Sequence, residues 1–324
     1  MITKSMIIST LIAFFITVLL SPTLIRFLQK LKFGQVIRDL GPEDHLKKKG
    51  TPTMGGIIFI FAIAVVSLLY MKDNPEILPI LFVTVGFGLI GFLDDYIKVT
   101  VKVAPGKDPG LKPLHKMLGQ IVITGVFAWY MIFNSGHGTS LLIPFTGGME
   151  IDLGILYVPV LFFVVLGTVN GANFTDGLDG LASSVTLLIT VFLTVVAIGF
   201  GVTGILPITC ATIGALLGFL VFNVYPARVF MGDTGSLALG GFVVSTAYVL
   251  RIPFLIPVFA FIYLAEVVSV ILQVAYFKKT GGKRLFKMAP IHHHYEKSGW
   301  PETKVTTIFS IVTAVLCLVA YLAI

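Results

Sequence analysis

Two adjacent carboxylates, Asp94 and Asp95, stand where a long apolar run meets polar sequence. Seventeen uncharged and mostly apolar residues, Ile77 to Leu93, precede them. A run of that length belongs in a bilayer, so the two acids are expected at the boundary with water. Adjacent carboxylates repel each other and gain nothing from packing. A cation ligand or a reaction site therefore explains them better than a simple polar end to a span.

Further charged residues extend this chemistry. Lys98 and Lys116 belong to the polar segment after the pair, and Asp233 stands between Gly232 and Thr234 at the start of a later apolar run. Phosphoryl transfer needs acids that hold a metal ion beside bases that hold phosphate. Hard oxygen ligands next to phosphate favour Mg²⁺ over zinc, and Asp233 is placed to complete a metal site with the pair. Thr234 or Ser236 is expected to cap the run that follows.

A third polar segment, 170–180, carries four amide or carboxylate side chains, three glycines and no basic residue. The amides and acids are Asn170, Asn173, Asp176 and Asp179. A helix cap would explain one acid, but not two amides as well. Amides and acids in a glycine-rich turn suit recognition of sugar hydroxyls or of a nucleobase.

Two more segments are candidates for phosphate binding. Lys48 lies in a run of three lysines before Gly55 and Gly56, whose N–H groups are expected to approach an anion. Lysines beside a membrane are more often a topology signal or a contact to anionic lipid than a phosphate site. The other segment, 289–296, contains three consecutive histidines. Since they cannot all face one ion, we expect one or two of them to donate to phosphate oxygens.

The elements that position these residues are predicted to cross a membrane. The chain is 56% hydrophobic and 12% charged, whereas soluble domains are roughly 45–50% apolar and 25% charged. Runs long enough to span hydrocarbon predict an all-α integral membrane protein with one domain, 1–324, and ten transmembrane helices. The predicted spans are Ser5 to Leu28, Met54 to Met71, Ile77 to Leu93, Met117 to Phe133, Leu153 to Val169, Leu181 to Phe200, Ile205 to Phe222, Gly235 to Leu250, Ile252 to Phe277 and Val305 to Ile324.

The distribution of basic residues predicts the topology. Ten spans place twenty of the 23 Lys and Arg residues on one face, and leave Lys4, Lys72 and Arg251 on the other. The positive-inside rule makes the richer face cytoplasmic, so both termini are expected outside and the active-site cleft on the cytoplasmic face. The same rule explains the net charge of +7 without a nucleic-acid partner.

The sequence also predicts the form of two further segments. The glycine-rich segment 134–152 is expected to form a small hairpin. Glu266 lies inside the 26-residue run Ile252 to Phe277, which as a straight helix would measure about 39 Å against about 30 Å of hydrocarbon. We therefore expect that span to tilt or break, with Glu266 facing protein or a water-filled groove.

Five motifs in this order resemble one family. They are Gly-Thr-Pro-Thr-Met-Gly-Gly (50–56), Phe-Leu-Asp-Asp-Tyr-Ile-Lys (92–98), Asn-Phe-Thr-Asp-Gly-Leu-Asp-Gly (173–180), Phe-Met-Gly-Asp-Thr-Gly-Ser (230–236) and Pro-Ile-His-His-His-Tyr-Glu (290–296). The chain resembles the phospho-N-acetylmuramoyl-pentapeptide transferases, within the polyprenyl-phosphate sugar-1-phosphate transferase superfamily. The histidine motif is the part that resembles this family specifically.

The resemblance implies an Mg²⁺-dependent enzyme of the bacterial plasma membrane. It would transfer phospho-MurNAc-pentapeptide from UDP-MurNAc-pentapeptide to undecaprenyl phosphate, giving lipid I and UMP for peptidoglycan synthesis and hence for the cell wall, cell shape and cell division. It implies catalytic roles for Asp94, Asp95, Asp233 and His292, with the three aspartates linked to Mg²⁺. The implied substrate-binding residues are Lys48, Lys98, Lys116, Asn170, Asn173, Asp176, Asp179, Asn223, Phe230 and His293.

Two alternatives remain open. A sibling enzyme would transfer GlcNAc-1-phosphate from UDP-GlcNAc to a polyprenyl phosphate, and assays of both UDP-sugars separate the two. An ion-coupled transporter would also suit ten spans, but it should place ionisable groups near the midplane, and only Glu266 lies within a predicted span. The oligomeric state is left open, with a homodimer as one option.

Overall fold

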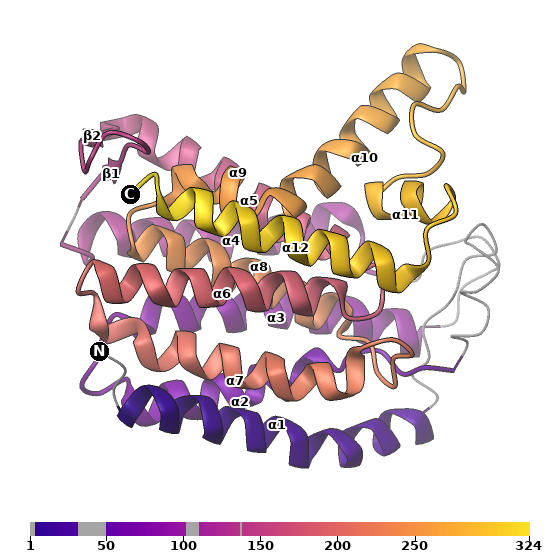
Figure 1. Ribbon diagram of the computed structural model, residues 1–324, viewed down its shortest axis with the longest axis horizontal. Helices are drawn as coiled ribbons and strands as arrows, with labels where there is room; N and C mark the ends of the chain where they lie inside the picture. The colour runs from indigo at the N-terminus through magenta and orange to yellow at the C-terminus, as the bar shows by residue number, and fades with distance from the viewer. Residues whose placement is uncertain (1–3, 32–49, 102–109, 137) are drawn as a thin grey trace.

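The long apolar runs fold into helices because a bilayer offers no water to the backbone, and a helix satisfies its own N–H and C=O groups. A computed structural model describes residues 4–31, 50–101, 110–136 and 138–324. Its helices pack side by side into a bundle (Figure 1). They are α1 (Lys4–Lys30), α2 (Gly56–Tyr70), α3 (Ile77–Thr100), α4 (Pro113–Phe133), α5 (Tyr157–Thr175), α6 (Leu181–Gly199), α7 (Leu206–Asn223), α8 (Gly232–Val249), α9 (Ile256–Phe259), α10 (Phe261–Lys279), α11 (Ile291–Glu296) and α12 (Glu302–Tyr321).

Every predicted span overlaps an α-helix of the structure, and the run Ile252 to Phe277 overlaps two, α9 and α10. Within the described residues, eight helices are long and apolar enough to cross a membrane, namely α1, α3, α4, α5, α6, α7, α10 and α12; α5 and α7 are counted with the 3₁₀ turns that precede them. The chain is therefore a helical, multi-pass membrane protein. The helix α2 is shorter, at 15 residues, and α8 is not among the eight. The count of ten crossings and the side of the termini stay predictions.

The helix α8 is the centre of the bundle. Every residue from Thr234 to Tyr248 is buried, so this helix has no lipid-facing surface that would require large apolar side chains. Its glycines instead allow close approach: a Cβ atom added to Gly240 would lie 2.6 Å from the Cα atom of Val169 in α5. Small residues at helix contacts are how membrane helices pack closely.

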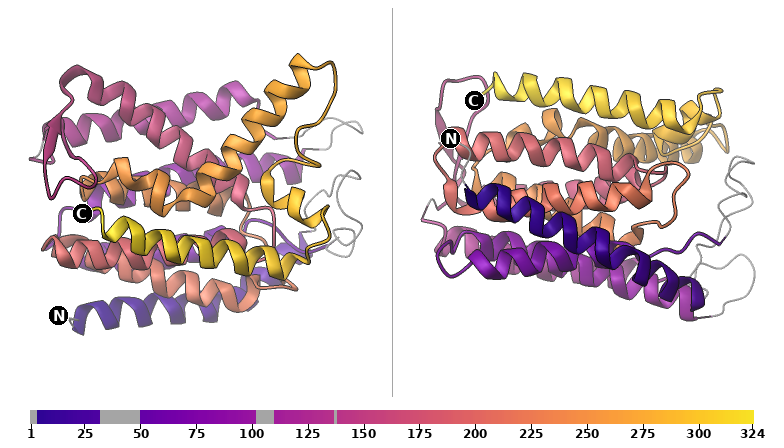
Figure 2. Two further views of the ribbon diagram at one scale, coloured as in Figure 1. Left: turned by 45° about the horizontal axis from the view of Figure 1, so that its top comes forward. Right: turned by 60° about the horizontal axis from the view of Figure 1, so that its bottom comes forward.

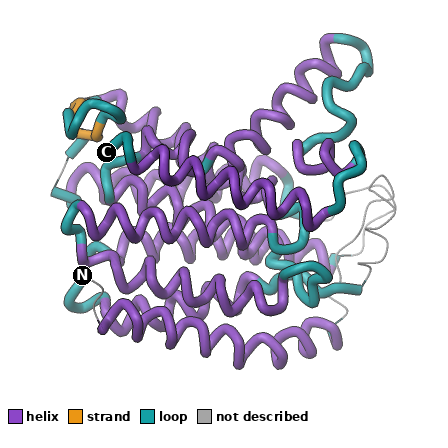
Figure 3. Tube along the Cα trace, in the orientation of Figure 1, coloured by secondary structure: helices purple, strands orange, loops and turns teal. Residues whose placement is uncertain are grey.

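The predicted outer hairpin is confirmed. The strands β1 (Ser140–Leu142) and β2 (Glu150–Asp152) pair antiparallel, with Leu141 opposite Ile151. They lie at the end of the bundle where α1 begins and α12 ends (Figure 3). The backbone joins them to that end, since Phe145 N donates to Ala323 O at 2.7 Å.

The expectation that the long run containing Glu266 tilts or breaks is confirmed, because the run breaks. The run divides into the 3₁₀ turn η4 (Pro253–Leu255), α9 and α10, and the backbone leaves helical geometry at Ala260. The helix α10 leans away from the bundle, and α11 lies between it and α12 (Figures 1 and 2). Glu266 is fully buried in protein, as the cost of a lipid-facing charge requires.

Candidate active site

Four charged side chains from three helices meet at one end of the bundle. Lys98 Nζ lies 2.8 Å from Asp94 Oδ2 and 2.9 Å from Asp233 Oδ2. Lys116 Nζ lies 2.7 Å from the same Asp233 oxygen and 3.4 Å from Asp94 Oδ2. The last turns of α3 supply Asp94 and Lys98, the start of α4 supplies Lys116, and the first turn of α8 supplies Asp233. We call these four residues the lysine–aspartate cluster.

Asp94 is held on both of its oxygens. Its Oδ2 faces the lysines, while Leu111 N donates to its Oδ1 at 2.6 Å, so the segment that enters α4 covers it. The residue is 3% exposed. Two cationic groups and one backbone donor therefore fix this carboxylate in place.

Asp95 faces the start of α8. Its Oδ2 accepts hydrogen bonds from Thr234 N at 2.9 Å and from the Thr234 hydroxyl at 2.7 Å, and its Oδ1 accepts from Asp233 N at 3.2 Å. The first N–H groups of a helix have no acceptor within the helix. Here the carboxylate of Asp95, from another helix, accepts their hydrogen bonds. Asp95 thus joins α3 to α8 beside Asp233. Its predicted roles as catalyst and metal ligand stay predictions.

The expectation that Thr234 or Ser236 caps α8 is wrong. The residue at the cap position is Met231, which makes no side-chain capping bond. The Thr234 hydroxyl donates to Asp95, and the Ser236 hydroxyl donates to Gly232 O at 3.0 Å. Because Asp95 already satisfies the first N–H groups of α8, a local cap is not needed.

Glycines allow α3 and α8 to approach this closely. A Cβ atom added to Gly91, one turn before Asp95, would lie 2.1 Å from Asp233 O. Gly232 adopts a positive φ of 70° and faces Asp95, and a Cβ there would lie 2.5 Å from Asp95 Oδ2. A larger residue at either position would push Asp233 away from Asp94.

The start of α2 binds to the same region through its backbone. Gly55 N donates to Phe230 O at 2.8 Å, and Gly56 N donates to Met231 O at 3.0 Å. The expectation that these two N–H groups contact an anion is therefore wrong, because carbonyl oxygens of the loop before α8 accept them.

Two of the predicted polar residues, at the end of α5 and directly after it, lie beside the lysine–aspartate cluster. Asn173 Nδ2 donates to Asp233 Oδ1 and to Ser236 Oγ, each at 2.8 Å. Asp176 accepts a hydrogen bond from Gly232 N, but burial and the nearby charges of Asp233, Asp95 and Asp179 raise the pKa of Asp176 well above its usual value. Asp176 therefore belongs to the same electrostatic site as the aspartates of α3 and α8.

Three of the predicted nucleotide-pocket residues hold the polar loops together. Asp179 Oδ2 accepts from Ala227 N at 2.8 Å. Asn223 accepts from the Ser183 hydroxyl at 2.7 Å and donates to Val229 O at 3.0 Å. Phe230 N donates to Pro52 O at 2.9 Å. These contacts join the loops after α5 and α7 to the segment before α2.

Asn170 lies one turn deeper in α5 than Asn173. Its Nδ2 donates to Gln120 Oε1 at 3.1 Å and to Leu166 O at 2.8 Å. Gln120, in α4, is buried. The structure thus places Asn170 in a contact between α4 and α5, outside the lysine–aspartate cluster.

The three histidines point in different directions, as expected. His292 is buried: its Nδ1 lies 3.1 Å from Glu266 Oε2, without an aligned hydrogen bond, and its Nε2 faces Gly177. His293 Nδ1 lies 2.7 Å from Glu296 Oε2, and His294 Nδ1 accepts from Lys287 N at 3.1 Å. His292 therefore packs α11 against both α10 and the loop after α5.

Sequence patterns missed several residues that build the site. Leu111, Gly91, Gln120 and Glu302 were not predicted, and Glu302 accepts a hydrogen bond from Asp179 N. Only the glycine one turn before the aspartate pair gave a signal, because a glycine inside an apolar helix often marks close packing. Lys48 lies outside the described residues.

The carboxylate oxygens of the lysine–aspartate cluster are ligands of the kind that Mg²⁺ prefers. Within the described residues, no three His, Cys, Asp or Glu side chains form a preformed metal-binding group. Mg²⁺ does not need one, because it is commonly bound by one or two carboxylates together with substrate phosphates and water. Oδ2 of Asp94 and Oδ2 of Asp233 share both lysine ammonium groups, so two hard oxygens already converge. This donor chemistry fits Mg²⁺.

A multi-pass helical bundle with carboxylates, lysines and amides gathered at one end suits a membrane-bound transferase. Residues 77–251 match the model of glycosyl transferase family 4. Residues 48–60 match signature 1 of phospho-N-acetylmuramoyl-pentapeptide-transferase. Together the two matches contain the first four polar motifs of the chain.

Curated proteins of that name resemble the chain over nearly their whole length. One from Clostridium perfringens (strain SM101 / Type A) is 49% identical over 99% of this chain and 97% of its own length. One from Clostridium kluyveri is 50% identical over 97% of this chain and 98% of its own. One from Clostridioides difficile (strain 630) is 49% identical over 98% and 97%. The chain belongs to the phospho-N-acetylmuramoyl-pentapeptide-transferase family.

Proposed function

We propose that this protein transfers phospho-MurNAc-pentapeptide from UDP-MurNAc-pentapeptide to undecaprenyl phosphate, giving lipid I and UMP. The reaction would take place at the cytoplasmic face of the bacterial plasma membrane. The observation that carries the proposal is the lysine–aspartate cluster, in which Lys98 and Lys116 lie within 3.4 Å of the carboxylates of Asp94 and Asp233. Paired cations beside paired acids suit a diphosphate substrate and a cation that accompanies it.

In this proposal the transfer is direct. An oxygen of the lipid phosphate attacks the β-phosphorus of the UDP-sugar, a new P–O bond forms, and the bond from that phosphorus to the bridging oxygen breaks. UMP leaves with the bonding electron pair. The second pKa of a phosphate monoester is about 6, so most of the lipid phosphate is a dianion at pH 7 and needs little help from a base. Alignment of the two substrates supplies much of the catalysis.

The residues have distinct roles in this scheme. Lys98 and Lys116 bind the phosphate oxygens, and Asp94 orients the lipid phosphate. Asp95 fixes the start of α8 and thereby the position of Asp233. Bound by Asp233 and Asp94 together with substrate oxygens, Mg²⁺ would neutralise negative charge on the diphosphate.

The nucleotide and sugar are assigned to the neighbouring loops. Asn173 and Asp176 lie beside Asp233, while Asp179, Asn223 and Phe230 hold the loop framework around it. His293 is the histidine proposed to contact phosphate, because its side chain is partly exposed whereas His292 is buried. The burial of His292 by Glu266 and Gly177 favours a positioning role for that residue.

The test is release of UMP by purified protein given UDP-MurNAc-pentapeptide and a polyprenyl phosphate, with and without Mg²⁺. We expect Mg²⁺-dependent UMP and a lipid-linked sugar product. UDP-GlcNAc in place of the muramoyl substrate separates the sibling activity, and turnover with UDP-GlcNAc alone would overturn the proposal. UMP release that is unchanged when Mg²⁺ is chelated would overturn the metal assignment but not the transfer.

A further inference from the structure

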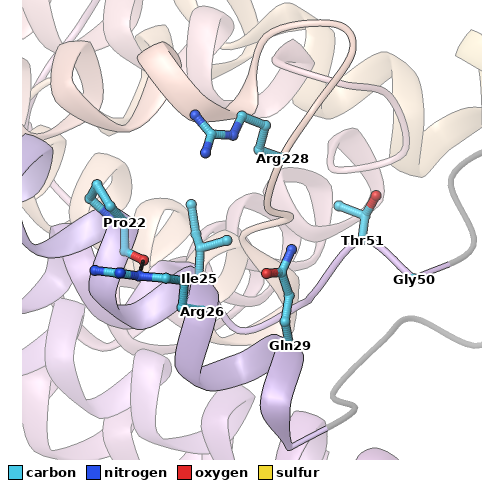
Figure 4. A pocket seen from close by; sticks show the side chains of 7 residues that line it. All are labelled: Pro22, Ile25, Arg26, Gln29, Gly50, Thr51 and Arg228. Atoms are coloured by element: carbon cyan, nitrogen blue, oxygen red, sulfur yellow. Dashed lines mark hydrogen bonds between the residues drawn. The ribbon is translucent and has the colours of Figure 1, made fainter.

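A cavity of about 520 Å³ lies away from the lysine–aspartate cluster, between α1 and the loop that joins α7 to α8 (Figure 4). From α1 it is lined by Pro22, Ile25, Arg26 and Gln29. Thr51, before α2, and Arg228, in the loop after α7, complete its polar wall. None of these residues belongs to the proposed transfer site.

The polar wall favours an anion. Arg26, from α1, and Arg228, from the loop after α7, border the cavity on different sides, and Gln29 and Thr51 also line it (Figure 4). No acid lines it in the described part of the chain. Arg26 Nε donates to Pro22 O at 3.2 Å, and its other guanidinium donors bond to no group among the described residues. Guanidinium groups match the oxygens of a phosphate and bind them through two parallel hydrogen bonds.

An apolar path leads from this cavity along the membrane-spanning part of α1. Phe15, Leu19, Pro22, Arg26 and Gln29 follow one another at spacings of four and three residues, so they share one face of the helix. Leu19 is 72% exposed and Phe15 is 53% exposed. A soluble anion would make no use of this path, whereas the acyl chain of a lipid would lie along it.

We propose that the cavity binds the phosphate headgroup of an anionic membrane lipid, with Arg26 and Arg228 on the phosphate and an acyl chain along Phe15 and Leu19. The inference is independent of the proposed transfer reaction. It rests on the cavity, its two arginines and the exposed face of α1.

A lipid bound there would contact the loop that leads into α8 and so to Asp233. Arg228 follows Ala227, whose N–H donates to Asp179, and precedes Phe230, whose N–H donates to Pro52 O. The bound phosphate would thus join α1 to the loop framework of the active site. Stabilisation of the fold by this lipid is the expected consequence, because a ligand that binds only the folded state raises its stability.

The experiment measures thermal unfolding of the purified full chain in detergent, titrated with phosphatidylglycerol, with phosphatidylcholine of the same acyl chains, or with inorganic phosphate. The test variant is R26Q/R228Q. The matched control is K278Q/K279Q, which removes the same charge from the exposed end of α10. Native mass spectrometry counts the phosphatidylglycerol molecules that each protein retains.

We expect phosphatidylglycerol to raise the Tm of the wild type more than phosphatidylcholine does. R26Q/R228Q should need at least about tenfold more phosphatidylglycerol to reach half of the maximal Tm shift, which corresponds to the loss of about one charge-assisted contact. In native mass spectra this variant should retain one lipid molecule fewer than the wild type. The control should match the wild type. If R26Q/R228Q proves too unstable to titrate, R26Q and R228Q are measured singly, and each should weaken the response.

Three outcomes would overturn the proposal. Equal responses of R26Q/R228Q and the control, or unchanged responses of both single variants, would show that the cavity does not bind the lipid. An equal effect of phosphatidylcholine would show that only the acyl chains are recognised. A full shift with inorganic phosphate would assign the cavity to a soluble anion.

Discussion

The ammonium group of Lys116 lies 2.7 Å from Oδ2 of Asp233, although 117 residues separate the two along the chain. Lys98 contacts the same oxygen across 135 residues. The bundle therefore brings the end of α3, the start of α4 and the start of α8 to one point.

Asp94→Asn and Asp233→Asn should each lower kcat by at least about 10², the scale for removing one preorganised electrostatic group. Both carboxylates contact the two lysines. Asp94 also accepts a hydrogen bond from Leu111 N, and Asp233 accepts one from the Asn173 side chain. Neither residue joins two helices through backbone groups, so the Tm should stay near that of the wild type. The assay is UMP release at equal protein concentration. Asp152→Asn, in the outer hairpin, is the matched control and should be fully active. Near-normal turnover of either test variant removes that residue from the site.

Asp95→Asn should lower activity by a similar factor and should also destabilise the protein. Asp95 accepts three hydrogen bonds at the start of α8, and a buried charged acceptor of this kind contributes on the order of 1–3 kcal/mol. Thr234→Val removes only one donor and should cost less, about 1 kcal/mol. The measurement is thermal or denaturant unfolding. Equal stabilities of Asp95→Asn and Asp233→Asn would contradict the assigned structural role of Asp95.

Gly91→Ala should separate α3 from α8. Its Cβ would lie 2.1 Å from Asp233 O, and a backbone oxygen cannot move aside as a flexible side chain can. We expect a loss of about 1–3 kcal/mol in stability together with a large loss of kcat. Gly167→Ala in α5 is the control, because nothing lies within 4 Å of the added atom. That variant should be neutral or slightly stabilised. Wild-type activity of Gly91→Ala would mean that the α3–α8 contact does not position Asp233.

Glu266→Leu should weaken the packing of α11 against α10, since it removes the only buried carboxylate beside His292 among the described residues. Gly177→Ala should disturb the same contact from the other side, because its Cβ would lie 2.1 Å from His292 Nε2. Both variants should show lower Tm and lower turnover than wild type. A Glu266→Leu protein that is as stable and as active as the wild type would show that the residue has no positioning role.

The direct route predicts that no UMP forms before the lipid substrate is present. Enzyme mixed with UDP-MurNAc-pentapeptide in detergent free of lipid phosphate should release no stoichiometric UMP, and polyprenyl phosphate added afterwards should start turnover. Acid-quenched protein is analysed by mass spectrometry for a phospho-sugar adduct. An adduct on Asp94 or Asp95, with one equivalent of UMP, would replace direct transfer with a covalent intermediate.

The sequence alone determined the class of fold and which polar segments could contribute to a site. Each apolar run predicted a helix because the bilayer forces the backbone to bond within its own segment, and the over-long run Ile252 to Phe277 predicted a span that tilts or breaks. The polar motifs at the ends of these runs predicted Asp94, Asp233, Lys98, Lys116 and Asn173 for one site, because charged and amide groups are costly in lipid and persist there for function.

Only the tertiary structure decided which of these residues meet, because hydrogen-bond partners are chosen by packing across distances that local sequence does not encode. Asp94 and Asp95 are neighbours of the same type, yet successive residues of a helix point about 100° apart. One carboxylate therefore faces the lysines and the other faces the start of α8. Gly91, Leu111 and Gln120 owe their roles to the helix that packs against each of them, which is why sequence patterns did not single them out.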